Sequence, residues 1–127
     1  PEDAKKFLDL TGVNMLAPAV GNIHGMLKGG ADPALSIKTV AAVSQATGVP
    51  LVLHGASGNS KEDIVAAIDA GVAIVHVNTE LRVAYRQGLT IALQEKPDEI
   101  SPYKYLKPAR DAMQKVVLEK LKIFNKI

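Results

Sequence analysis

The chain has 127 residues, enough for one hydrophobic core and no more than one domain. Apolar residues make up 47% of the sequence and the net charge is only +2, which predicts a globular fold and argues against a nucleic-acid-binding surface. There is no cysteine, so disulfides and thiolate chemistry are excluded, and this fits a reducing, cytoplasmic location. No apolar run reaches the ~18 residues that would span a bilayer.

Three helical segments each end in a small residue followed by Gly and Val, and a short apolar run follows each of them. These runs are residues 15–20, 51–53 and 73–77. Gly12, Gly48 and Gly71 suit the left-handed residue that ends a helix. Short apolar runs without alternation are typical of strands buried on both faces of a parallel sheet. The sequence therefore predicts three parallel strands, the first of them preceded by the helix over residues 1–11.

Capping residues predict where the two helices between these runs begin. Asp32 as the cap and Pro33 as the first helical residue predict one helix. Its apolar face is expected to hold Leu35, Val40, Ala41 and Val43. Ser60 is expected to begin the next helix, with Asp63 three residues later as in a weak capping box, and Gly71 to end it. Its apolar residues at helical spacing are Ile64, Ala67 and Ile68.

Beyond residue 82 the chain becomes helical and charged. One long helix is expected to carry Val83, Leu89 and Leu93 on one face, and residues 96–98 (Lys-Pro-Asp) are expected to break it. Pro108 is expected to open a terminal helix. Its apolar stripe is Met113, Val117, Leu121 and Phe124. Such a stripe is typical of core packing rather than of a cofactor site.

Strict alternation of helices and strands with short loops predicts an α/β fold with right-handed crossovers. A complete (β/α)8 TIM barrel needs about 250 residues. We therefore expect the C-terminal portion of such a barrel, about its last three βα units, followed by C-terminal helices. A small open doubly wound sheet is the alternative. Because the sequence starts at Pro1, without Met and within a helical pattern, residues 1–127 are expected to be one partial domain of a longer chain.

All three histidines lie at or near the ends of the predicted strands, where parallel α/β sheets bind their ligands. His24 follows the first run, His54 ends the second and His76 lies near the end of the third. Imidazole is the commonest metal ligand at neutral pH. His24 and His54, each followed by glycine, are candidate metal ligands, although hydrogen-bonded loop histidines would show the same pattern. A catalytic zinc normally has three protein ligands, so at least one more is expected from outside the chain.

The segment Gly55-Ala56-Ser57-Gly58 leads into the helix capped by Ser60. Small residues before a helix N-terminus can hold a phosphate on backbone amides, and the loops after the last two strands are the usual phosphate site of a barrel. An ordinary tight turn is the alternative. Strand alternation places His76 and Asn78 on one side and Val75 and Val77 on the other, so the polar pair is expected to face the barrel interior.

Three segments together resemble the class II fructose-bisphosphate and tagatose-bisphosphate aldolases: residues 22–25 (NIHG), 51–58 (LVLHGASG) and 77–82 (VNTELR). The resemblance implies a zinc-dependent lyase that cleaves fructose 1,6-bisphosphate into dihydroxyacetone phosphate and glyceraldehyde 3-phosphate. It also implies a monovalent cation (Na⁺ or K⁺) at the phosphate loop and a homo-oligomer, dimer or tetramer. The zinc ligands would be His24 and His54. The substrate contacts would be Gly25, Gly55, Ala56, Ser57, His76, Val77, Asn78 and Thr79.

Two residues depart from the family pattern, since Ala56 replaces a glycine of many members and His76 replaces the usual asparagine. The family's catalytic aspartate and first zinc histidine would lie before Pro1, so no catalytic residue is assigned here and the chain alone is expected to be inactive. The alternatives are a preference for tagatose bisphosphate, a non-catalytic phosphate-binding or assembly subunit, and a barrel enzyme that uses the same phosphate loop without metal.

Overall fold

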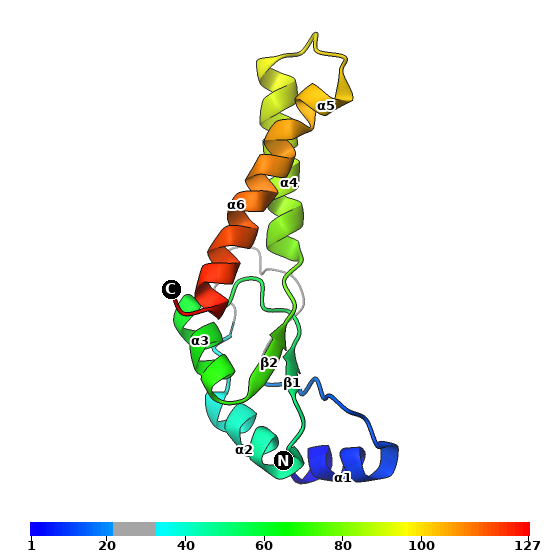
Figure 1. Cartoon of the computed structure of the whole chain (residues 1–127), viewed down its shortest axis with the longest axis vertical. Coiled ribbons are helices and arrows are strands. Elements are labelled where there is room, and N and C mark those ends of the chain that lie inside the picture. The colour runs from blue at the N-terminus through cyan, green and yellow to red at the C-terminus, as the bar shows by residue number, and fades with distance from the viewer. Residues whose placement is uncertain (22–32) are drawn as a thin grey trace. The chain divides into compact units, whose positions relative to one another are not determined.

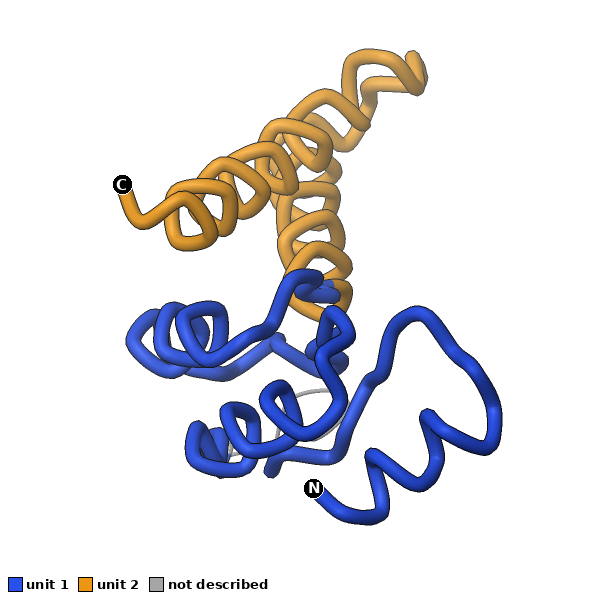
Figure 2. Tube along the Cα trace, turned by 60° about the horizontal axis from the view of Figure 1, so that its bottom comes forward, with its two compact units in different colours: residues 1–77 blue, residues 78–127 orange. Residues whose placement is uncertain are grey.

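The computed structural model describes residues 1–21 and 33–127. The predicted site residues His24 and Gly25, and the predicted helix cap Asp32, lie outside the described residues. The chain divides into two compact units, Pro1–Val77 and Asn78–Ile127 (Figure 2). Each unit is described separately below.

The first unit alternates helices and strands in the order α1, α2, β1, α3, β2 (Figure 1). The bounds are α1 Glu2–Thr11, α2 Ile37–Thr47, β1 Leu51–Leu53, α3 Lys61–Asp69 and β2 Val72–Val75. The two strands pair in parallel, and α3 is the crossover between them. The predicted α/β alternation is therefore confirmed from α2 to β2, whereas no strand element separates α1 from α2 among the described residues.

The predicted strand over residues 15–20 is reduced to one parallel bridge between Leu16 and Leu51. The N–H of Leu16 donates to the carbonyl of Pro50 at 3.2 Å, and the N–H of Val52 donates to the carbonyl of Leu16 at 2.9 Å. Pro18 has no N–H and cannot continue such a ladder. The segment thus pairs with β1 as predicted, but it is not a regular strand in the structure.

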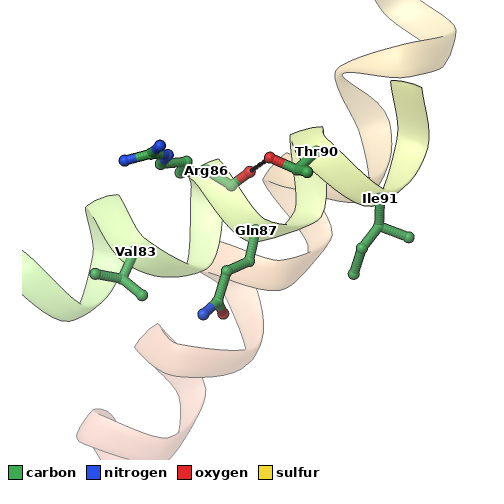
Figure 3. A pocket seen from close by; sticks show the side chains of 5 residues that line it. All are labelled: Val83, Arg86, Gln87, Thr90 and Ile91. Atoms are coloured by element: carbon green, nitrogen blue, oxygen red, sulfur yellow. Dashed lines mark hydrogen bonds between the residues drawn. The ribbon is translucent and has the colours of Figure 1, made fainter. Parts of the chain in front are cut away.

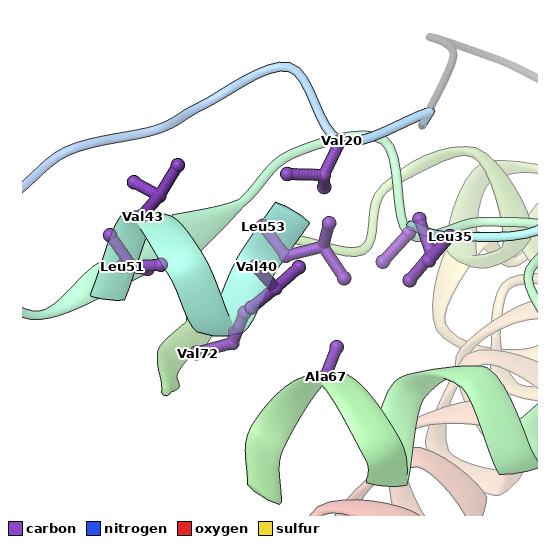
Figure 4. Packing of buried hydrophobic residues seen from close by; sticks show 9 residues of the cluster. Val20, Leu35, Val40, Val43, Leu51, Leu53, Ala67 and Val72 are labelled. Atoms are coloured by element: carbon purple, nitrogen blue, oxygen red, sulfur yellow. The ribbon is translucent and has the colours of Figure 1, made fainter. Parts of the chain in front are cut away.

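The hydrophobic core of the first unit lies where α2 and α3 pack against β1 (Figure 4). Leu51 is fully buried and Leu53 is 1% exposed, and burying each such side chain contributes about 1.5–3 kcal/mol. The remaining buried members are Val20, Leu35, Val40, Val43, Ala56, Ala67 and Val72. Burial of Leu53 at the end of β1 and of Ala56 in the following loop therefore fixes the end of the strand and the start of the loop to the core.

Helix α2 begins later than the sequence predicts. Its N-cap is Ser36 rather than Asp32, and Pro33 lies before the helix. The N–H of Ser36 donates to the carbonyl of Val20 at 2.8 Å, which holds the preceding residues in a non-helical conformation. Leu35 is buried as predicted, but the prediction for Ala41 is wrong because Ala41 is exposed.

Helix α3 begins as predicted, because the Ser60 hydroxyl accepts a hydrogen bond from the N–H of Asp63 at 3.0 Å. Gly12 and Gly48 end α1 and α2 in the left-handed conformation, each with φ of 65°. Gly71 follows Ala70, the C-cap residue of α3, and has φ of 121°. A Cβ at Gly71 would collide with the Ser44 side chain of α2, so this turn requires glycine.

The second unit contains α4 (Thr79–Glu95), α5 (Pro102–Tyr105) and α6 (Lys107–Phe124), with α4 and α6 side by side (Figure 1). A Cβ at Gly88 would lie 2.8 Å from the Ala109 Cα, so the two backbones meet almost directly. Lys120 of α6 forms an ion pair with both carboxylate oxygens of Glu80 on α4, at 2.8 and 2.7 Å. The predicted helix break after Glu95 and the opening of α6 near Pro108 are confirmed.

The predicted apolar face of α4 is wrong, because Val83 and Leu93 are 41% and 45% exposed. The buried residues of α4 are instead Gly88 and Ala92, since only small residues fit where the helices approach so closely. The exposed face of α4 forms a shallow groove lined by Val83, Arg86, Gln87, Thr90 and Ile91 (Figure 3). The predicted stripe on α6 is also only partly buried, because Val117 and Leu121 are 39% and 49% exposed.

Candidate functional site

The ends of β1 and β2 bring two of the predicted site residues into direct contact. His54 directly follows β1, and His76 directly follows β2. The N–H of His76 donates to the carbonyl of Leu53 at 2.9 Å, so the two histidines are neighbours across the sheet. Their Nδ1 atoms are 3.1 Å apart, and the rings meet edge to face at 73° with centroids 4.5 Å apart.

A register shift between the strands produces this pairing. Leu51 pairs with Val72, but Leu53 pairs with Val75, so β2 has one residue more than β1 over this stretch. Such a bulge redirects the side chains that follow it. Without the extra residue, His54 would lie beside Val75 instead of His76. The bulge was not predicted, because a single inserted residue leaves no compositional signal.

Alternation beyond the bulge places the rings on the face opposite the hydrophobic core. Val75 and Val77 pack against the core, whereas His76 is exposed. The predicted opposition of His76 to these two valines is confirmed. Asn78 begins the second unit as the N-cap residue of α4, and Thr79 is the first residue of that helix. Their role in a shared site with His76 stays a prediction.

The loop after His54 has the conformation that its glycines allow. Gly55 and Gly58 have φ of 64° and 96°, while Ala56 and Ser57 are 0% and 2% exposed. Among the described residues other than glycine, only Lys126 has a positive φ, so the backbone at Ala56 is unstrained. The N–H of Ala56 donates to the carbonyl of His76 at 3.4 Å, which ties the loop to the end of β2.

The start of α3 is occupied by the chain itself. Ser60 caps the helix, and Glu62 and Asp63 lie in its first turn. Two carboxylates near these amides disfavour an anion directly at the helix end. Phosphate binding by this loop stays a prediction; around Gly55 and Gly58 its backbone is not covered by side chains of its own.

The paired rings have the donor chemistry and spacing of a metal site. Two nitrogens bound at about 2.0–2.1 Å to one tetrahedral zinc ion lie about 3.3–3.4 Å apart. The observed 3.1 Å between the Nδ1 atoms of His54 and His76 is close to that value. In residues 1–21 and 33–127, no group of three or more His, Cys, Asp or Glu side chains could hold a metal, so this pair is an incomplete ligand set.

None of the helices in residues 1–21 and 33–127 is both long and apolar enough to cross a membrane.

Comparison with protein families decides to which group this arrangement belongs. The sequence model of the family described as "Fructose-bisphosphate aldolase class-II" matches residues 1–127. The chain belongs to this family. The predicted resemblance is thereby confirmed.

Individual aldolases agree with the family match. A probable fructose-bisphosphate aldolase of Bacillus subtilis is 40% identical over 125 residues, which cover 98% of this chain and 43% of the relative. The crystal structure of the YdjI aldolase from Escherichia coli K12 has a TM-score of 0.76 at 37% identity, over 98% of this chain and 43% of that one. A putative fructose-1,6-biphosphate aldolase from Coccidioides immitis has a TM-score of 0.81 at 33% identity, over 98% and 42%.

The chain spans about two fifths of the length of these aldolases. The matching structures are aldolase barrels, so the predicted fold class, a portion of a (β/α)8 barrel consistent with its C-terminal part, is confirmed. The fructose-bisphosphate aldolase of Campylobacter jejuni shares the fold at a TM-score of 0.82 with 19% identity, over 100% of this chain and 45% of that one.

Proposed function

We propose that the protein containing this chain is a zinc-dependent class II aldolase. It would cleave fructose 1,6-bisphosphate reversibly into dihydroxyacetone phosphate and glyceraldehyde 3-phosphate. The observation that carries the proposal is the imidazole pair at the ends of two parallel strands, in a chain whose whole length matches the aldolase family. The relatives named fructose-bisphosphate aldolase support the substrate.

The metal ligands that the family resemblance implies in this chain are His24 and His54. The assignment of His54 is supported by its place at the end of β1, where its Nδ1 lies 3.1 Å from the Nδ1 of His76. Zinc, when bound, supplies a Lewis acid for the ketone of the substrate. The remaining ligands and the proton-transferring carboxylate would come from other parts of the protein.

The phosphate end of the substrate is proposed to bind along the loop after β1. The contacts are Gly25, Gly55, Ala56, Ser57, His76, Val77, Asn78 and Thr79. Ala56 and Ser57 are buried, so the loop would act through its backbone and would hold one end of the substrate in a fixed position. A Na⁺ or K⁺ ion at this loop, a cytoplasmic location and a dimeric or tetrameric assembly belong to the same proposal.

The test is aldol cleavage by the natural full-length protein, measured by coupling the triose products to NADH oxidation. We expect activity with fructose 1,6-bisphosphate, loss of activity with a chelator and recovery with zinc. His54→Ala should lower kcat/KM by more than about 100-fold, because the loss of a ligand exceeds the 10- to 100-fold typical of outer partners. Ala41→Ser, an exposed position on α2, is the matched control and should not change activity.

Other substrates and roles are outcomes of the same assay. A higher kcat/KM for tagatose 1,6-bisphosphate would replace the fructose assignment. Zinc binding without cleavage of either sugar would refute the enzyme and support a phosphate-binding or assembly subunit. Cleavage that survives complete removal of the metal would refute zinc dependence.

A further inference from the structure

The contact between His54 and His76 has a chemical requirement that a pair of ordinary surface histidines does not. Two neutral imidazoles with Nδ1 atoms 3.1 Å apart must share one proton, since one nitrogen has to donate and the other to accept. Either ring can be the donor; the donating ring is then the Nδ1–H tautomer and the accepting ring the Nε2–H tautomer. His54 is partly buried and His76 is exposed, so this hydrogen bond competes with water.

The backbone holds the pair in place independently of the ring contact. The N–H of His76 donates to the carbonyl of Leu53, and its carbonyl accepts from the N–H of Ala56, so His76 is fixed on both sides of its Cα. Ala56 is fully buried in the core, which anchors the loop after His54. Two donor atoms therefore approach each other on a rigid frame, as ligands of a metal must.

We propose that His76 is a metal ligand and that it shares one divalent transition-metal ion with His54 through the two Nδ1 atoms. The inference rests on the proposed function only for the identity of the ion, zinc. Binding requires the proton on Nδ1 of the donor ring to leave to water while its Nε2 takes a proton from water. Both rings then bind as neutral ligands and no net proton is released. The remaining coordination positions are open to other protein groups or water.

This assignment also leaves His76 a hydrogen-bond donor for the substrate. With Nδ1 on the metal, the ring carries its hydrogen on Nε2, which can donate to a substrate oxygen. His76 would thus bridge metal and substrate. An asparagine at the same position provides the hydrogen bond but is a poor ligand for zinc, which prefers imidazole and thiolate donors.

The test uses the natural full-length protein and zinc alone as the probe. Zinc affinity is measured by competition with a chromophoric chelator, and the zinc X-ray absorption fine structure counts the imidazole ligands. His76→Asn is the matched variant because its amide can still hydrogen-bond to His54. We expect a loss of more than about 100-fold in affinity, beyond the 10- to 100-fold effect of an outer hydrogen-bond partner, and one imidazole fewer in the spectrum.

His76→Cys is the second variant, because this chain has no cysteine and a thiolate ligand gives a distinct sulfur shell at about 2.3 Å. The appearance of that shell supports the proposal, even if the Asn variant does not fold. An unchanged imidazole count in His76→Asn together with no sulfur shell in His76→Cys overturns it, whatever the affinities. Aldolase activity is assayed separately: an inactive protein with the expected spectra would refute the proposed function alone.

Discussion

The turn at Gly71 makes a sharp prediction about stability. Gly71 joins α3 to β2 with φ of 121°, and a Cβ there would lie 2.6 Å from the Ser44 Cβ on α2. In Gly71→Ala the strained backbone would cost about 1–3 kcal/mol and the collision about another 1–3 kcal/mol. The free energy of unfolding should therefore fall by about 2–6 kcal/mol in total.

Gly12→Ala is the matched control, because Gly12 also has a positive φ of 65° but a Cβ there would have no atom within 4 Å. It should cost only the left-handed penalty of about 1–2 kcal/mol. The assay is urea unfolding of the natural full-length protein, followed by circular dichroism. Ser44→Gly combined with Gly71→Ala should recover about 1–3 kcal/mol of the loss through relief of the collision. If Gly71→Ala costs no more than Gly12→Ala, the packing argument is refuted.

Two further predictions concern a helix cap and a carboxylate. Ser60→Ala should lower the free energy of unfolding by about 0.5–2 kcal/mol through loss of the hydrogen bond from Asp63, whereas Ser60→Asp should retain most of it; urea unfolding of both variants checks this. Hydrogen bonds from Lys104 and from the Ser101 N–H lower the pKa of Glu99 from 4.5 to about 2. The stabilisation that results is present above pH 4.5 and is lost as the pH falls towards 2. Lys104→Gln should raise this pKa, as measured by carboxyl-carbon NMR, and an unchanged titration would contradict the assignment.

Local signals in the sequence predict the parts of the fold that local chemistry determines. Ser60 begins α3 because its own hydroxyl accepts the N–H three residues later, and Gly12 and Gly48 end helices because they tolerate a left-handed conformation. The exposure of His76 opposite Val75 follows from alternation along one strand. None of these depends on a distant part of the chain.

The features that the sequence did not predict depend on contacts between distant segments. Helix α2 starts at Ile37 because the carbonyl of Val20 holds the residue before it. The buried face of α4 centres on Gly88 because the backbone of Ala109 lies against it. In both cases the local sequence pattern was compatible with another helix start or another buried face, and the tertiary contact determined the observed one.

The unequal lengths of β1 and β2 have a consequence for comparing relatives of this chain. The additional residue near Ala73 decides which side chain lies opposite His54. In a homologue that lacked this residue, a valine would lie opposite His54 in place of His76, although both histidines would still be present in its sequence. Homologues that retain both histidines but lose that residue should therefore be treated as having lost the pair. Strand length, as well as residue identity, therefore determines whether the two rings can meet.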